Sequence, residues 1–199
     1  MISKISEGIT RRISENLPDI SKEKAEHIEY GLYMLISELY KILLILMLSY
    51  ILGVLAYTIV VIFVLGLMRN FLGGVHAKTH IGCLISYSAV IFGIIGISSI
   101  CKLEPVFVLV FTAPLSFILA YKYAPADDIN KPILSRKQRK RLRKFGFITL
   151  TSILLSSIIV PTFWAKILLF TCIAESITLT PIVYKITGNK YGFKEEELL

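Results

Sequence analysis

The chain has 199 residues, 55% of them are hydrophobic, and its mean hydropathy is +0.70. The apolar residues form long uncharged runs between short charged clusters, which excludes a soluble domain and predicts an integral membrane protein. A net charge of +8 also occurs in nucleic-acid-binding proteins. Here, however, the basic residues flank apolar runs and form no basic face with aromatic residues for base stacking, so we expect no nucleic-acid partner.

The first 27 residues are polar and charged and lack the apolar core of a cleaved signal peptide. Within residues 2–17, an isoleucine or leucine recurs every three or four positions, and charged residues fill the other faces. This pattern predicts an amphipathic helix that lies on an anionic membrane surface. Pro18 is expected to end this helix, and Asp19 or Ser21 to cap the next one. The apolar positions are Ile2, Ile5, Ile9, Ile13 and Leu17.

Six apolar runs follow, and each is an expected membrane span. A helix needs ~20 residues to cross the hydrocarbon core, so the second and fourth runs are short for this purpose. The six runs cover residues 30–50, 52–68, 81–100, 106–121, 145–160 and 164–184.

The first two runs nearly merge, so a single span over residues 42–67 would reduce the number to five. Charge favours six. The loop expected over residues 122–144 and the N-terminal segment 1–27 both carry several lysines and arginines, which mark cytoplasmic segments. Only an even number of spans places both on one side. We therefore expect six spans, cytoplasmic N- and C-termini, and residues 69–80 at the cytoplasmic face.

The expected architecture is thus one all-α polytopic membrane domain over residues 1–199. It comprises an amphipathic cytoplasmic segment (1–27), a six-helix membrane bundle (30–184) and a cytoplasmic tail (185–199).

Three charged residues interrupt the apolar runs. A charge in lipid costs about 3 kcal/mol or more, so Glu38, Lys41 and Glu175 are expected to face the bundle interior or an interface. Glu38 and Lys41 are three residues apart and are expected to pair along one helix. Of the three cysteines, Cys101 and Cys172 lie in or beside apolar runs and are expected to be inert packing residues.

The segment from Arg69 to Cys83 joins the second span to the third. It holds two of the three histidines, two adjacent glycines, an arginine and a cysteine. If residues 76–84 form a helix, His76, His80 and Cys83 lie on one face of it. Three interpretations of this face remain open on spacing alone.

The first interpretation is a cysteine nucleophile with a histidine base. The thiolate is the reactive form, and a histidine within hydrogen-bond reach takes the thiol proton and returns it to the leaving amine. Gly73 and Gly74 allow close approach of a substrate, and their N–H groups would stabilise an oxyanion. A helix that begins after the glycines adds positive potential. Arg69 would orient a substrate carboxylate or favour the thiolate.

The second interpretation is a zinc site formed by His76, His80 and Cys83. The metalloprotease pattern needs a glutamate directly after the first histidine, where Ala77 stands, and no fourth ligand is obvious, so we expect no metal. In the third interpretation the histidines are polar residues at the membrane interface, and Cys83 merely begins a span.

Two motifs give a resemblance to a known family. Gly73-Gly74-Val75-His76-Ala77, with Cys83 downstream at the cytoplasmic end of a span, is similar to the accessory gene regulator B family. The family carries a similar Ala-Pro and Lys-Pro-Ile pattern in its basic loop. Here that pattern is Tyr123-Ala124-Pro125-Ala126-Asp127 followed by Lys131-Pro132-Ile133.

The resemblance implies a membrane cysteine endopeptidase without a cofactor. It would cut a quorum-sensing signal propeptide of the AgrD type near its C-terminal part and support cyclisation of the product to a thiolactone autoinducing peptide. Cys83 would be the nucleophile and His76 the base, with Arg69, Gly73 and Gly74 supporting substrate or oxyanion. His80 has no role in this pattern.

The resemblance also implies partners: the propeptide, the cell membrane and a second copy in a homodimer. The propeptides of the family have an acidic C-terminal tail, which the basic residues 136–144 would attract. Two alternatives belong to other classes. A small membrane transporter would explain the spans and their charged residues but not the two motifs, and a non-catalytic membrane scaffold would tolerate changes at His76 and Cys83.

Overall fold

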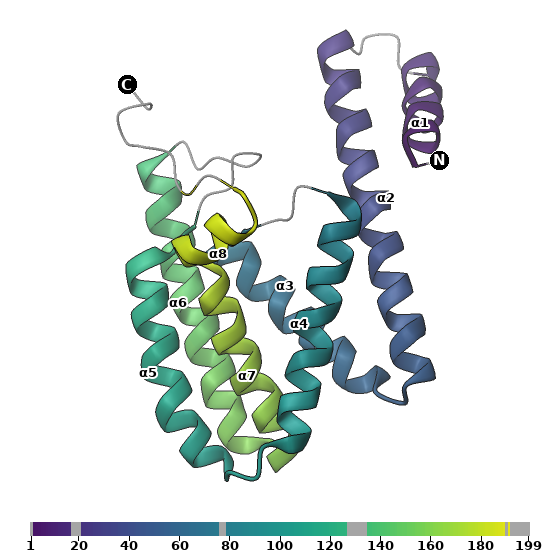
Figure 1. Cartoon of the computed structure of the whole chain (residues 1–199). Helices are drawn as coiled ribbons and strands as arrows, with labels where there is room; N and C mark the ends of the chain where they lie inside the picture. The colour runs from purple at the N-terminus through teal and green to yellow at the C-terminus, as the bar shows by residue number, and fades with distance from the viewer. Residues whose placement is uncertain (1, 17–20, 76–78, 127–134, 190, 192–199) are drawn as a thin grey trace. The chain divides into compact units, whose positions relative to one another are not determined.

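The computed structural model describes the whole chain except residues 1, 17–20, 76–78, 127–134, 190 and 192–199. Its described residues form eight α-helices and no strand beyond an isolated bridge, which confirms the all-α class (Figure 1). They divide into two compact units, Met1–Gly53 and Val54–Leu199, which we take in turn.

The first unit consists of α1 (Ile2–Asn16) and α2 (Lys22–Ile51), which pack against each other. The amphipathic helix predicted over residues 2–17 is confirmed by α1. Ser6 and Thr10 are buried, whereas Ile5 and Ile9 are exposed, so α1 packs through small polar residues and leaves apolar ones outward. This arrangement suits a helix whose apolar face enters a membrane surface.

Helix α2 begins earlier than the first apolar run, which was expected to start at residue 30. Its N-cap is Ser21, which is one of the two predicted caps. The Ser21 hydroxyl accepts a hydrogen bond from the N–H of Lys24 at 3.4 Å. The helix start predicted from these caps is therefore confirmed, and the charged first turns extend α2 beyond the apolar run. With 30 residues α2 is about 45 Å long, more than the ~30 Å of a hydrocarbon core. The predicted Glu38–Lys41 pair is confirmed.

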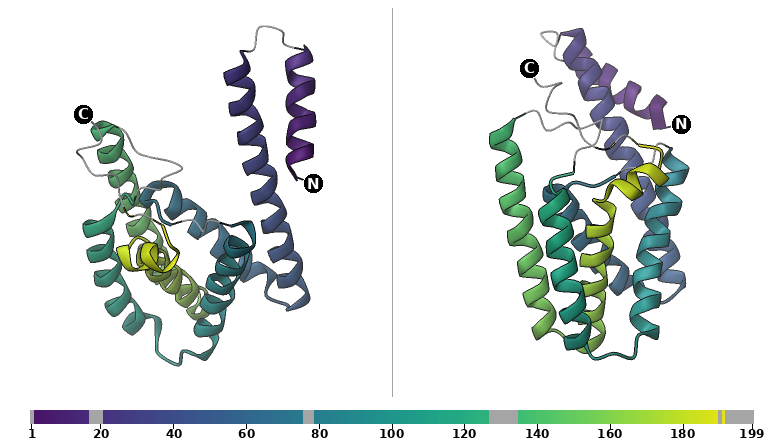
Figure 2. Two further views of the ribbon diagram at one scale, coloured as in Figure 1. Left: turned by 45° about the horizontal axis from the view of Figure 1, so that its top comes forward. Right: turned by 60° about the vertical axis from the view of Figure 1, so that its left-hand side comes forward.

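The second unit holds the remaining helices. Helix α7 contacts α3, α4, α5 and α6, and Figures 1 and 2 show it with α5 and α6 on one side and α4 on the other. The bounds are α3 (Leu55–Leu72), α4 (His80–Ile100), α5 (Pro105–Tyr123), α6 (Arg136–Ile159), α7 (Thr162–Thr178) and α8 (Pro181–Ile186).

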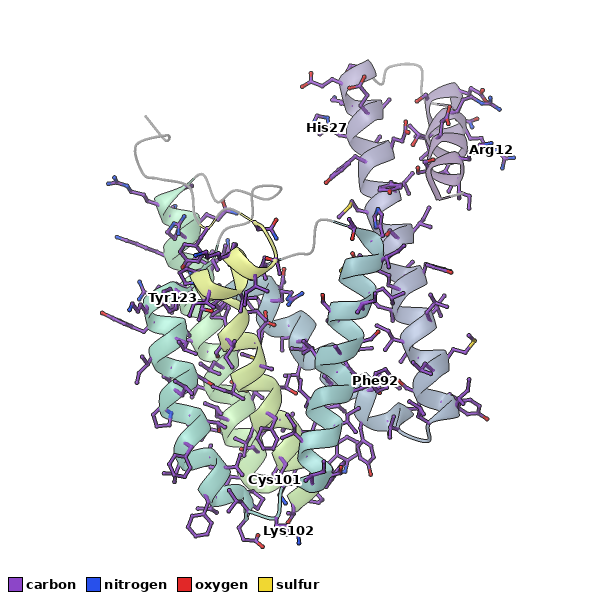
Figure 3. All side chains as sticks on the ribbon, in the orientation of Figure 1. Arg12, His27, Phe92, Cys101, Lys102 and Tyr123 are labelled. Carbon is purple, nitrogen blue, oxygen red and sulfur yellow. The ribbon has the colours of Figure 1, made fainter. Side chains whose placement is uncertain are left out.

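Of the described helices, α2 to α6 are long and apolar enough to cross a membrane, and α7 has 17 residues. Nevertheless α7 runs the length of the second unit. Near its start, Lys166 Nζ donates to the Cys101 carbonyl at 2.7 Å, and at its end Thr178 lies beside Gly74. Figure 3 shows Cys101 and Tyr123 at opposite ends of this unit.

The expected separation of the first two apolar runs is confirmed, since α2 ends at Ile51 and α3 begins at Leu55. Two other boundaries correct the sequence prediction. The expected basic loop 122–144 is helical from Arg136, because arginine, lysine and glutamine are good helix formers. The run 164–184 breaks before Pro181, which has no N–H to continue α7 and instead starts α8.

Helix α5 shows how the helices divide their faces. Its buried residues recur every four positions and are mostly small, which permits close packing against neighbouring helices. Large apolar residues at similar spacing on its other side are exposed, as expected for a surface that faces lipid. The buried residues are Val108, Thr112, Ser116 and Ala120, and the exposed ones Phe107, Phe111, Leu115 and Ile118.

Candidate functional site

The end of α3 is shaped by Gly73. This residue is the C-cap of α3, with a φ of 80°, and its N–H donates to the Arg69 carbonyl at 3.1 Å. A Cβ atom at Gly73 would overlap the Ala126 carbonyl oxygen. Glycine is therefore needed both for the left-handed backbone and for the close approach of another chain segment. The N–H that we expected to support an oxyanion is already used in the helix cap.

The segment that approaches Gly73 is the second family motif. Gly73 and Ala126 form a parallel bridge, and the Ala126 N–H donates to the Leu72 carbonyl at 2.8 Å. Ala124 and Ala126 are buried beside it. The two motifs, about 50 residues apart in sequence, thus lie in direct contact, which the sequence did not predict. The Lys131-Pro132-Ile133 part of the second motif lies outside the described residues.

Cys83 lies in the first turn of α4. The N-cap is Thr79, whose hydroxyl accepts from the N–H of Gly82 at 3.0 Å, and the Cys83 N–H donates to the Thr79 carbonyl at 2.9 Å. The thiol is half-buried and not in a disulfide. The N-terminal turn of a helix carries positive potential, which favours a thiolate. This confirms the expected helix start after the glycines.

The hypothesis that residues 76–84 form one helix, with His76, His80 and Cys83 on a shared face, is wrong. Helix α4 begins at His80, and Thr79 has extended backbone angles (φ −118°, ψ 148°), so no continuous helix joins residue 76 to Cys83. Of the two histidines only His80 is on α4, three residues before Cys83. His76, the expected base, lies outside the described residues.

A buried ion pair lies beside the glycines. Arg69 Nε of α3 donates to Glu175 Oε1 of α7 at 3.2 Å, and the Glu175 side chain is completely buried. Gly74 has a φ of 138°, and a Cβ atom there would lie 3.2 Å from Glu175 Oε1 and 3.1 Å from Thr178 Oγ1. The interior position expected for Glu175 is confirmed. Its partner was missed, although two opposite charges in neighbouring apolar segments were a usable signal.

Arg69 also faces α4. Its guanidinium carbon lies 6.0 Å from the centre of the Tyr87 ring, and its charge interacts with Tyr87 and Cys83. A half-buried thiol at a helix N-terminus, a guanidinium and a buried carboxylate thus come together from α4, α3 and α7. Such a thiol has the surroundings of a nucleophile. Among the residues that the structure describes, no three histidine, cysteine or acidic side chains form a metal-binding group.

Comparison with known proteins agrees with the two motifs. A family model described as Accessory gene regulator B matches residues 6–179. The chain is 30% identical over 157 residues to the putative AgrB-like protein 2 of Clostridium perfringens strain 13, covering 76% of this chain and 73% of that protein.

Two further relatives come from other genera. Accessory gene regulator protein B of Staphylococcus aureus strain MRSA252 is 26% identical, covering 82% of this chain and 89% of the relative. Protein FsrB of Enterococcus faecalis strain OG1RF is 28% identical, covering 92% of this chain and 77% of FsrB. No solved structure matches the chain.

Proposed function

Because the chain belongs to the accessory gene regulator B family of membrane-embedded quorum-sensing proteins, we propose that it is a cysteine endopeptidase that cleaves and helps cyclise an AgrD-like signal propeptide. The observation that carries this proposal is the placement of Cys83 in the first turn of α4, on the side that faces Arg69. In this proposal Cys83 is the nucleophile and His76 the general base.

In the first step His76 takes the proton of the Cys83 thiol. The thiolate sulfur attacks the carbonyl carbon of the scissile peptide bond, the C–N bond breaks, and the leaving amine receives the proton from His76. The products are a thioester on Cys83 and the free C-terminal fragment. Cys83 lies in the first turn of α4, and the positive charge of Arg69 interacts with it.

In the second step the thiol of a cysteine within the bound propeptide gives its proton to His76 and attacks the thioester. A new C–S bond closes the thiolactone ring, the bond to Cys83 breaks, and Cys83 recovers the proton. Exchange of one thioester for another keeps the acyl group activated without a nucleotide. Water must be kept from the acyl-enzyme, because hydrolysis would release a linear peptide.

The site is proposed to lie at the cytoplasmic face, with both termini on the same side. Support comes from the basic residues at the start of α6, at the end of the unit that carries the Gly73–Ala126 bridge. Arg143 Nη2 donates to the Tyr121 carbonyl at 2.6 Å, and Arg139 Nη1 to the Pro125 carbonyl at 3.4 Å. Basic residues of this kind mark cytoplasmic segments and would also attract an acidic propeptide tail.

The test uses the purified protein in liposomes with the AgrD-like propeptide encoded nearest to its gene. Mass spectrometry is expected to detect an acyl adduct on Cys83 that disappears in Cys83→Ser and in His76→Ala. Cys101→Ser is the matched control, because Cys101 is also half-buried but lies at the other end of α4, and it should retain the adduct. Cleavage that persists in Cys83→Ser, or a folded protein that neither cleaves nor acylates, would favour a transporter or a scaffold instead.

A further inference from the structure

Glu175 is the most deeply buried charged residue among those that the structure describes. Its side chain has no exposed surface, and one carboxylate oxygen accepts from Arg69 Nε at 3.2 Å. The other oxygen, Oε2, accepts no hydrogen bond from the part of the chain that the structure describes. Burial of a carboxylate that leaves an oxygen unsatisfied costs several kcal/mol in general, and a well-packed apolar pair often serves stability better. Stability alone is therefore a weak reason for this pair.

The ion pair engages Arg69 through one guanidinium nitrogen, Nε. Glu175 binds the guanidinium through Nε, which leaves the two terminal nitrogens available for other contacts. The Arg69 side chain is 23% exposed, so it is not sealed in the bundle. Gly74 completes the arrangement, since any side chain there would press on Glu175 Oε1 and Thr178 Oγ1.

The guanidinium lies on the face of α4 that carries the thiol. Arg69 stacks over Tyr87, which is four residues after Cys83 and therefore on the same helical face. Helical side chains point back toward the N-terminus, so the Tyr87 ring leans over the turn that contains Cys83.

From this geometry we infer that Glu175 is a positioning residue: it holds Arg69 against the Cys83 face of α4, where the guanidinium stabilises the thiolate. The inference rests on the proposed function in taking Cys83 as the nucleophile. Without the carboxylate, a long cationic side chain at this depth would move toward water or lipid headgroups, and Cys83 would lose its interaction with the Arg69 charge.

Glu175 has a second, opposite effect that makes the inference testable. Its negative charge offsets part of the Arg69 charge, so its removal would favour the thiolate if Arg69 stayed in place. If Glu175 mainly holds Arg69 in place, its removal should lower the reactivity of Cys83. If Glu175 mainly offsets the Arg69 charge, its removal should raise that reactivity. In the described helices, Arg69 of α3 interacts with Cys83, His80 and Tyr87 lie three residues before and four residues after Cys83 on α4, and Glu175 of α7 binds Arg69.

The experiment measures alkylation of Cys83 by iodoacetamide in the full-length protein in liposomes, with the site resolved by mass spectrometry. At pH 7 we expect Glu175→Gln to slow alkylation about tenfold, and Glu175→Asp to slow it less, because the guanidinium no longer lies beside the thiol. At pH 10, above the ordinary pKa of a cysteine thiol, the rates should agree within about twofold. In an Arg69→Gln background, Glu175→Gln should have no further effect.

The matched control is Lys166→Gln, which removes the other buried charge of α7 at the opposite end of the bundle. It should lower thermal stability and leave Cys83 alkylation unchanged. The exchanged pair Arg69→Glu with Glu175→Arg should recover thermal stability but not the alkylation rate.

The inference would be overturned by faster or unchanged alkylation in Glu175→Gln, by an undiminished effect in the Arg69→Gln background, or by recovery of both properties in the exchanged pair. Since alkylation needs no propeptide, these outcomes are independent of whether Cys83 forms an acyl adduct.

Discussion

At the scale of single residues, Gly73 and Gly74 meet two different steric demands. Gly73 lets the Ala126 backbone approach the end of α3, whereas Gly74 lets the chain pass over the Arg69–Glu175 pair. Both residues also have backbone angles that side chains disfavour. The glycines thus assemble the site from within the protein, in addition to the substrate approach predicted from the sequence.

Gly73→Ala is expected to lower the free energy of unfolding by about 2 kcal/mol or more, because the new Cβ overlaps a backbone oxygen and the φ of 80° is strained. Thermal unfolding in detergent measures the change. Gly66→Ala is the matched control in the same helix, where a Cβ meets no atom within 4 Å, and it should be neutral or stabilising. Equal melting temperatures for the two variants would contradict this account of Gly73.

The sequence predicted part of the site. Cys83 was expected near a helix N-terminus after the glycines, and it lies there because Thr79 caps α4. The Arg69–Glu175 pair was not predicted. Two opposite charges in apolar segments were a signal, but the residues are 106 positions apart and a single sequence does not say that their helices pack together. The roles proposed for Cys83 and His76 stay predictions until the adduct is measured.

At the scale of helices, hydropathy predicted where the long helices lie but did not predict several of their ends. The apolar runs marked all six long helices, because each must bury its apolar side chains in lipid or protein. The polar start of α6 was missed, since charged residues with good helix propensity extend a helix beyond the membrane core without adding hydropathy. The start of α2 was predicted, because Ser21 was an expected cap. Pro181 was present in the sequence as a stop signal for α7, but the apolar run through Tyr184 obscured it.

Ser116→Leu is expected to destabilise the protein by about 1–3 kcal/mol, because Ser116 is fully buried in the small-residue stripe of α5 and a larger side chain would separate the packed helices. Ser152→Leu, at an exposed position of α6, should change the free energy of unfolding by less than about 0.5 kcal/mol. Thermal unfolding in the same detergent compares the two. A larger loss in Ser152→Leu would mean that the buried stripe does not set the packing.

At the scale of the whole molecule, the number of membrane crossings depends on α7. Its length alone falls below that of the five candidate spans, yet its ends lie beside Cys101 and Gly74, at opposite ends of the second unit. A helix that reaches both ends of a membrane-embedded bundle is expected to cross the membrane with its neighbours. The six crossings predicted from charge therefore remain our expectation, as does a single membrane domain over the whole chain.

Cysteine labelling from outside intact cells tests this topology. In a background of Cys83→Ser, Cys101→Ala and Cys172→Ala, single cysteines would replace three exposed lysines: Lys102 between α4 and α5, Lys140 in the first turns of α6, and Lys185 in α8. A membrane-impermeant maleimide should label Lys102→Cys directly, and Lys140→Cys and Lys185→Cys only after permeabilisation. Direct labelling of Lys185→Cys together with Lys102→Cys would show that α7 does not cross.

The central place of α7 has a consequence for biosynthesis. Helices α3 to α6 precede α7 in the chain and leave the ribosome before it, so Arg69 enters the bilayer before Glu175 exists. Likewise, the Cys101 carbonyl at the end of α4 is synthesised before its hydrogen-bond donor, Lys166. Until α7 inserts, an arginine without a counter-charge resists burial in lipid and should keep α3 near the headgroups. Arrival of α7 then fills the centre of the bundle and supplies both partners at once, so a chain truncated before α7 would stay loosely assembled and open to degradation by membrane proteases.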